Sequence, residues 1–322
     1  MDNQSIDPKI VEQVSKLQEK YEAMGQDLSS YLDGLLYSNY LTYWDYIHLD
    51  TLLSLQNPRT DFPDEEIFIM YHQITELYFK LIIHELKQIS TQGDGITDSF
   101  FLKRIQRINR YFLHLCDSFE VMIDGMDKEQ FLKYRMALLP ASGFQSVQYR
   151  KIEVMSTDFI YLVDHAYKEE LSQNTSIEKQ FAHIYWQQGA TELATGKQTL
   201  TLKMFMRKYR DDLIQLGKDM QACNLWRLYQ EHLQDTPLQQ EIVVALRSYD
   251  QLANINWPLS HYKSAVRYLH AEPKDIAATG GTNWQKYLPP RFQKRSFFPD
   301  LWSEEEKQEW GKAYVMEVIG KK

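Results

Sequence analysis

Apolar side chains recur every three or four residues along most of this chain, a spacing that places them on one face of a helix. No alternation of apolar and polar residues lasts long enough for a strand. The sequence therefore predicts an all-α fold. Helices are expected over residues 8–25, 43–55, 99–124, 128–139, 201–222 and 238–253, with a long helix that begins at Pro63-Asp64 and another that begins at Trp257-Pro258.

One large helical domain over residues 1–322 is the simplest organisation that fits this pattern. No internal repeat, low-complexity tract or Pro/Ser-rich linker separates two halves of the sequence. Residues 1–25 are expected to form a polar helix at the periphery. The helical pattern of apolar positions weakens over residues 170–200, and we expect this stretch to be an insertion or a loop.

Composition and charge narrow the class of protein. Of the 322 residues, 43% are hydrophobic and 25% are charged, as in soluble globular proteins. The net charge of −8 argues against a nucleic-acid partner. No signal peptide or run of about 18 apolar residues is present, which argues against a membrane partner. The two cysteines, Cys116 and Cys223, lack the spacing of a disulfide framework or a zinc site, so we expect a cytoplasmic protein.

The common catalytic motifs are missing, and the remaining candidates are histidines in apolar surroundings. The chain has no HExxH helix, no GxSxG elbow and no glycine-rich phosphate loop. His72 shares a helix face with Phe68, Thr75 and Phe79. A lone histidine in such a place is more often a hydrogen-bonded core residue than a cavity residue, and both possibilities stay open here.

His261 raises the same question on a second helix, where Trp257, Ala265 and Tyr268 lie on its side. The small side chain of Ala265 leaves room for a flat group. A neutral imidazole in an apolar pocket can ligate the iron of a haem, but spacing alone does not distinguish such a ligand from a core histidine.

Arg135 lies near the end of a short aromatic helix, next to a loop that contains Pro140 and Gly143. An arginine among aromatic residues most often stacks on the surface. Its planar fork also suits a ligand carboxylate, which it can bind through two parallel hydrogen bonds.

Several segments together resemble the tryptophan 2,3-dioxygenase family, in their residues and in their order. They are LTYWDYIHLDTLLSLQ, FIMYHQITELYFKLIIHEL and YRMALLPASGFQSVQYRKIE, followed by a W-x-x-x-H helix, a TGG turn and FFPDLW. The resemblance runs from about residue 41 to residue 302, and residues 160–250 match only in helical character.

The resemblance implies a haem b in each subunit, held between helices without a covalent bond. His261 of W-x-x-x-H is then the axial ligand of the haem iron, and Trp257 and Gly143 contact the haem. Some related haem proteins attach the group through a cysteine one turn beyond this histidine. Ala265 stands at that position, so a covalent link is not expected.

The same resemblance implies L-tryptophan and O2 as substrates. His72 is then the catalytic residue on the distal side, near the indole N–H, and Phe68 and Phe131 lie against the indole ring. The amino-acid end of the substrate is expected to be bound by Arg135, Ser142 and Thr279.

An interlocked homotetramer, a dimer of dimers, is implied as well. Residues 41–56 match a helix that caps the pocket of a neighbouring subunit, and Tyr43 and Tyr46 are the side chains that enter it. The chain departs from the family pattern at Trp44, at Trp284 and in a longer stretch between the W-x-x-x-H helix and the TGG turn.

The implied reaction is haem-dependent cleavage of the indole C2–C3 bond of L-tryptophan by O2. It gives N-formylkynurenine, in the first step of the kynurenine pathway. Two alternatives stay open: a haem oxygenase of the same superfamily that acts on another indole or aromatic amino acid, and a non-catalytic haem-binding helical oligomer. Arg135 and Ser142 favour a free amino acid as the substrate.

Overall fold

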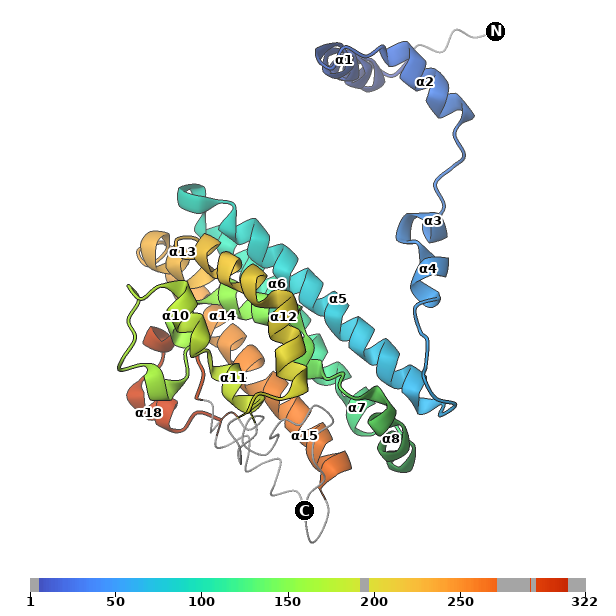
Figure 1. The fold of residues 1–322 in the computed structure, drawn as a ribbon. Coiled ribbons are helices and arrows are strands. Elements are labelled where there is room, and N and C mark those ends of the chain that lie inside the picture. Colours follow the sequence, from blue (N-terminus) through green and yellow to red (C-terminus); the bar gives the residue numbers. More distant parts are fainter. Residues whose placement is uncertain (1–5, 192–196, 271–289, 291–293, 312–322) are drawn as a thin grey trace. The chain divides into compact units, whose positions relative to one another are not determined.

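The computed structural model describes residues 6–191, 197–270, 290 and 294–311 (Figure 1). These residues form helices, helical turns and two isolated β-bridges, with no strand among them. The predicted all-α class is confirmed. The chain divides into two compact units, Met1–Leu55 and Gln56–Lys322, while the single domain expected over residues 1–322 stays a prediction.

The first unit consists of short helices with no buried residue. They are α1 Pro8–Ala23, α2 Leu28–Tyr37, α3 Tyr43–Ile47 and α4 Leu49–Leu53. The helix predicted over residues 43–55 is broken in two at His48, which has the left-handed backbone angles φ 52° and ψ 48°. A right-handed helix cannot continue through such a residue.

The long helix α5, Asp64–Ser90, is the central element of the second unit and packs along α6 (Asp98–Ser118) and α9 (Val147–Ser156). Its first turn carries three acidic residues, which the positive end of the helix dipole favours, and its predicted start is confirmed. Helix α6 also packs along α14, Gln239–Gln251. Buried side chains of these four helices are part of one hydrophobic core, to which other elements of the unit also contribute.

Further elements complete the described part of this unit. The helices are α7 Glu120–Ile123, α8 Lys128–Tyr134, α10 Ile177–Ala182, α11 Tyr185–Gly189, α12 Leu200–Asp219, α13 Leu225–His232, α15 Trp257–Leu269 and α18 Glu304–Gln308. The 3-10 turns are η1 Gly93–Gly95, η2 Arg135–Leu138, η3 Gly143–Gln145, η4 Phe159–Leu162, η5 His165–Tyr167 and η7 Pro299–Leu301. A single π-helical turn, η6 Leu252–Asn256, joins α14 to α15.

Residues 170–200 differ from the predicted loop, because they contain α10 and α11. Ile177 and Phe181 of α10 are buried, at 3% and 1% exposure. Gly217 of α12 allows this close packing: a Cβ there would lie only 2.8 Å from Cγ2 of Ile177 and 2.9 Å from the ring of Phe159. Helices of one or two turns are too short for their periodicity to be recognised in a polar sequence.

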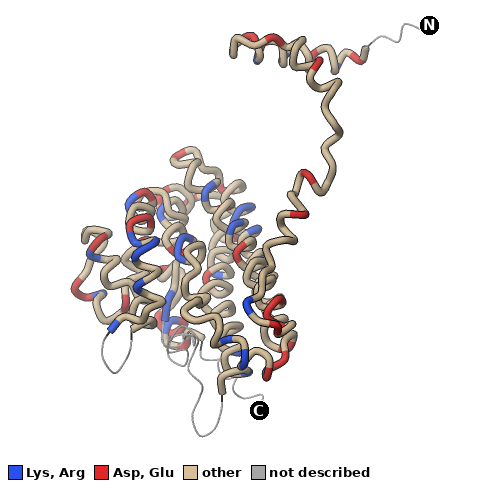
Figure 2. Tube along the Cα trace, turned by 45° about the vertical axis from the view of Figure 1, so that its right-hand side comes forward, with Lys and Arg blue, Asp and Glu red and all other residues tan. Residues whose placement is uncertain are grey.

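Basic and acidic residues are interspersed along the helices of the second unit (Figure 2). The charge of the chain is therefore spread over many elements. Among the described residues, none of the helices combines the length and the apolar character needed to cross a membrane.

Candidate functional site

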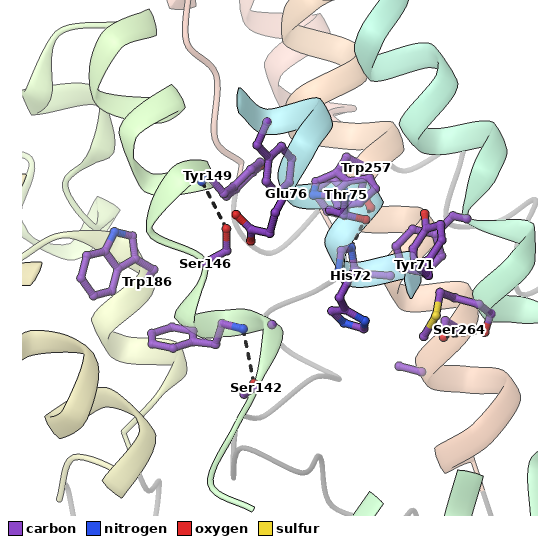
Figure 3. A pocket seen from close by; sticks show the side chains of 18 of the residues that line it. Tyr71, His72, Thr75, Glu76, Ser142, Ser146, Tyr149, Trp186, Trp257 and Ser264 are labelled. Carbon is purple, nitrogen blue, oxygen red and sulfur yellow. Dashed lines mark hydrogen bonds between the residues drawn. The ribbon is translucent and has the colours of Figure 1, made fainter. Parts of the chain in front are cut away.

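A cavity of about 360 Å³ lies in the second unit between α5, α9 and α15 (Figure 3). Its wall is dominated by aromatic rings, those of Phe68, Tyr71, Phe79, Phe119, Phe131, Phe144, Tyr149, Tyr185, Trp186, Trp257 and Tyr268. Cavities of this size with mostly apolar walls and a few polar groups are typical binding sites for small molecules. The rings favour a flat ligand.

His72 extends from α5 into this cavity (Figure 3). Its Nδ1 lies 2.7 Å from the carbonyl oxygen of Phe68, one turn earlier. Because a carbonyl oxygen only accepts, Nδ1 carries the proton and Nε2 keeps its lone pair. Burial lowers the pKa of His72, against the opposing effects of the Phe68 carbonyl and the Glu76 carboxylate. The imidazole is therefore neutral at pH 7.

His261 lines the same cavity from α15 and is in the same tautomer. Its Nδ1 faces the carbonyl oxygen of Trp257 at 3.4 Å, which leaves the Nε2 lone pair available. Its ring lies 4.7 Å from the indole of Trp257 and 4.6 Å from the ring of Phe119. The pKa of His261 is lowered to about 4, mainly by burial and with a contribution from the nearby His72, against the opposing effect of the Trp257 carbonyl.

The two histidines face the cavity singly. Over the ranges that the structure describes, no three histidine, cysteine, aspartate or glutamate side chains come together as a metal-binding cluster. Each imidazole thus offers one nitrogen lone pair in an apolar environment, which suits an axial ligand or a single hydrogen-bond acceptor.

Aromatic rings next to His72 form one wall of the cavity. The Phe68 ring lies 4.1 Å from the imidazole of His72 and 6.2 Å from the ring of Phe131. Phe131 in turn lies 4.7 Å from the ring of Tyr268 on α15. Tilted arrangements at these separations are favourable, so the rings form a packed wall beside His72.

A short capped turn brings Ser142 and Gly143 to the cavity wall. The Ser142 hydroxyl accepts a hydrogen bond from the Phe144 amide at 3.3 Å, and the Ser142 amide donates to Oε1 of Gln145 at 3.3 Å. This reciprocal pair is a capping box, which fixes where the η3 turn begins. Gly143 adds no side chain, so its backbone stays accessible from the cavity.

The structure brings most of the predicted site residues together. Those that line the cavity are Phe68, His72, Phe131, Ser142, Gly143, Trp257 and His261. Arg135 is buried, at 5% exposure, on the turn that follows α8, but it is not part of the cavity wall. Tyr43 and Tyr46 lie on α3 of the first unit and are exposed, and Thr279 lies outside the described residues.

The sequence model of the tryptophan 2,3-dioxygenase family matches residues 34–254, more than half of the chain. The chain belongs to this family. The tryptophan 2,3-dioxygenase of Ruegeria pomeroyi is 27% identical to it over 277 residues, which cover 83% of this chain and 92% of that protein. The protein of the same name from Bacillus anthracis is 26% identical over 277 residues, with 82% and 91% covered. One from Anaeromyxobacter sp. is 40% identical over 126 residues, with 38% and 46% covered.

The match to the tryptophan 2,3-dioxygenase family model contains His72, Arg135 and Ser142, and it ends before His261. The assignment of His261 therefore depends on the W-x-x-x-H motif and on the geometry of α15. The structure adds that His72 and His261 line one cavity, although they are far apart in the sequence.

A charged network that was not predicted from the sequence lies at the wall of this family member's cavity. Glu153 of α9 is fully buried and binds two guanidinium groups, those of Arg150 and Arg295, which both line the cavity. The Arg150 Nη1 also donates to the hydroxyl of Tyr185 at 3.0 Å. The i, i+3 spacing of Arg150 and Glu153 is a readable signal, whereas nothing in the sequence connects Arg295 to them. One carboxylate shared by two arginines leaves positive charge at this wall.

Proposed function

We propose that this member of the tryptophan 2,3-dioxygenase family is a haem-dependent dioxygenase of L-tryptophan. It cleaves the indole C2–C3 bond with O2, and both oxygen atoms end in N-formylkynurenine, as in the first step of the kynurenine pathway. The observation that carries the proposal is the pair of neutral histidines, His72 and His261, at one aromatic cavity. The family match and the similarity to tryptophan 2,3-dioxygenases of known name support it.

The residues of the cavity fit a haem b that is held without a covalent bond. The unprotonated Nε2 of His261 suits an iron, since a histidine ligand must be neutral and is oriented by the hydrogen bond of its other nitrogen. The Trp257 ring provides apolar contact, Gly143 leaves open space at the wall, and Arg150 and Arg295 provide positive charge for the carboxylates of a haem. When bound, the haem supplies the chemistry of oxygen activation.

The side chains near His72 orient the substrate. Phe68 and Phe131 form an apolar slot for the indole ring, and the lone pair of His72 Nε2 accepts a hydrogen bond from the indole N–H. Accepting this bond requires no net proton transfer, so the proposed role of His72 is to position the indole ring.

The amino-acid end of the substrate is bound beyond the indole slot. Ser142 lines the cavity, and Arg135 follows Phe131, which also lines it, by one turn. The Arg135 guanidinium is proposed to bind the substrate carboxylate. Thr279 is proposed to bind the same end of the substrate. A free amino acid is therefore favoured over a simple indole.

An interlocked homotetramer, a dimer of dimers, completes the proposed enzyme. The first unit has many exposed apolar side chains, among them Leu36 at 80%, Tyr37 at 88% and Tyr40 at 97% exposure. Such surfaces are typical of residues that a partner covers. We propose that Tyr43 and Tyr46 lie at the pocket of a neighbouring subunit. The proposed compartment is the cytoplasm, since both cysteines are free thiols.

The experiment that tests this function begins with chain purified from haem-supplied cells. The absorption spectrum is recorded, and L-tryptophan and O2 are then added while N-formylkynurenine is followed. The proposal expects a haem spectrum and product formation in the wild type, and loss of both in His261→Ala. A haem spectrum without product from L-tryptophan contradicts it.

The same experiment separates the alternatives. Product from another indole or aromatic amino acid, and none from L-tryptophan, identifies a related haem oxygenase. Haem binding without oxygen uptake for any of these compounds identifies a haem-binding helical oligomer. If the wild type binds no haem, both histidines are structural residues.

A further inference from the structure

Helices α14 and α15 do not form one continuous α-helix, because the π-helical turn Leu252–Asn256 joins them. A π turn takes one residue more than an α turn, and each residue of an α-helix turns the chain by about 100°. All side chains beyond the turn are therefore rotated about the helix axis by about 100° from the directions that an uninterrupted α-helix would give them. The direction in which α15 presents His261 to the cavity depends on this turn.

The turn leaves one carbonyl oxygen in need of a donor. The Trp257 amide donates to the carbonyl of Leu252, as the π pattern requires. The next donor in that pattern, for the carbonyl of Ala253, is at position 258, where proline has no N–H. A helix in this register thus cannot satisfy the Ala253 carbonyl from its own backbone.

Tyr149 supplies the missing donor from α9. Its hydroxyl donates to the Ala253 carbonyl oxygen at 3.0 Å. The Tyr149 hydroxyl oxygen itself accepts from Nη2 of Arg295 at 3.0 Å. Because a guanidinium only donates, the hydroxyl proton of Tyr149 is committed to the Ala253 carbonyl. The Tyr149 ring lies at the cavity wall, 5.5 Å from the ring of Phe79 on α5 (Figure 3).

A second contact holds the same turn. Asn254 donates through Nδ2 to Oδ1 of Asp250 at 2.6 Å, and its Oδ1 accepts from Nε of Arg295 at 2.5 Å. All three side chains are buried. Arg295 thus connects both contacts of the turn, one directly and one through Tyr149.

We propose that Tyr149 is a positioning residue for His261: its hydroxyl stabilises the π turn, and the turn fixes the direction of the His261 imidazole. The inference rests on the proposed haem function, in which His261 is the axial ligand. Without the hydroxyl, the Ala253 carbonyl loses its donor. The turn then samples other registers, and His261 holds the haem iron less firmly.

The test compares Tyr149→Phe with a matched control, Tyr249→Phe. Each variant removes one hydrogen-bonded hydroxyl, from the partly buried ring of Tyr149 or from the fully buried ring of Tyr249. The Tyr249 hydroxyl lies 2.6 Å from Oγ of Ser156, and Tyr249 is not part of the cavity wall. Three quantities are measured: the rate of haem transfer to excess apomyoglobin, the iron–histidine stretching band of the ferrous protein, and amide hydrogen exchange of residues 252–260 in the haem-free chain.

Tyr149→Phe is expected to lose haem about tenfold faster than wild type, because one lost hydrogen bond is commonly worth about that factor in an equilibrium. Its iron–histidine band shifts, and its amides 252–260 exchange faster. Tyr249→Phe lowers the melting temperature but changes haem loss less than about twofold. The proposal is overturned if Tyr149→Phe loses haem at the wild-type rate and its iron–histidine band is unshifted.

The outcome is separable from the proposed function. If the wild type binds no haem or forms no product, the function fails, and amide exchange in the haem-free chain still tests the contact. Unchanged exchange of residues 252–260 in Tyr149→Phe then overturns the role of its hydroxyl. If the wild type forms product and Tyr149→Phe behaves like Tyr249→Phe, only the positioning role is wrong.

Discussion

His72 and His261 reach one cavity from two helices in the same tautomer, each with Nδ1 facing the carbonyl oxygen four residues earlier. Both Nε2 lone pairs are therefore available to ligands. The surroundings of the two rings differ. His261 lies against Phe119 and Trp257, whereas His72 lies beside Phe68 and is influenced by the Glu76 carboxylate. The proposed roles, iron ligand for His261 and acceptor of the indole N–H for His72, use these two lone pairs.

The stability of the haem-free chain should depend on pH through His72. Burial lowers its pKa below the ordinary value of 6.5, so between the two pKa values the unfolded chain binds a proton that the folded chain does not. The contribution of His72 to stability is thus lost as the pH falls below about 6.5.

Urea unfolding of wild type and His72→Gln at about pH 7.5 and about pH 5.5 measures this effect. The wild type should lose more unfolding free energy than the variant over this interval. Equal losses in the two proteins contradict the prediction, because groups common to both then account for the whole pH dependence.

Arg135→Ala should weaken the recognition of the substrate carboxylate. Removing one partner of a desolvated charge pair costs about 2–4 kcal/mol, so kcat/KM for L-tryptophan should fall by about 30-fold to 1000-fold. The haem spectrum should not change. Tryptamine, which lacks the carboxylate, is the control substrate, and its turnover should be affected much less. An equal loss for both compounds shows that Arg135 acts on the fold and not on the carboxylate.

Complementation between subunits tests the interlocked assembly. A subunit with Tyr43→Ala and Tyr46→Ala lacks the side chains that it is proposed to contribute to its neighbour's pocket. A subunit with Arg135→Ala lacks the arginine of its own pocket. Each homo-oligomer should be impaired. Random mixing of the two in one tetramer restores roughly a quarter of the sites, if each site combines residues of two chains. Activity of the co-expressed mixture that equals the average of the two homo-oligomers contradicts the shared site.

Gly217→Ala should destabilise the packing of α12 on α10. The new Cβ would lie 2.8 Å from Cγ2 of Ile177 and 2.9 Å from the ring of Phe159, which is closer than van der Waals contact. Such overpacking costs about 1–3 kcal/mol, measured as a lower free energy of unfolding. Gly34→Ala on α2 is the control, since its Cβ meets nothing within 4 Å. A stability loss as large in the control contradicts the packing argument.

The long helices of the second unit could be predicted because each buries a regular apolar stripe, as α5 and α6 do. The histidines could be singled out because an imidazole interrupts such a stripe at His72 and again at His261. Their shared cavity could not be derived from periodicity, which describes each helix separately. The family resemblance supplied that connection.

Other features have no local sequence signal. The π turn depends on Tyr149 and Arg295, which come from other parts of the chain, and only Pro258 hints at it. The break at His48 is a backbone conformation that histidine adopts only occasionally, so the pattern predicted one helix there. The ion pair of Glu153 with Arg295 joins residues 142 positions apart, a separation that no local spacing rule covers.

The most direct test of the central claim is whether both atoms of O2 are found in the product. The haem-loaded chain is given L-tryptophan under ¹⁸O-labelled O2, and the mass of the product is measured by mass spectrometry early in the reaction. The account predicts N-formylkynurenine with both new oxygen atoms labelled, since cleavage of the indole C2–C3 bond places one at each carbon. A product with a single label, or none formed while the haem spectrum is intact, would contradict the dioxygenase assignment.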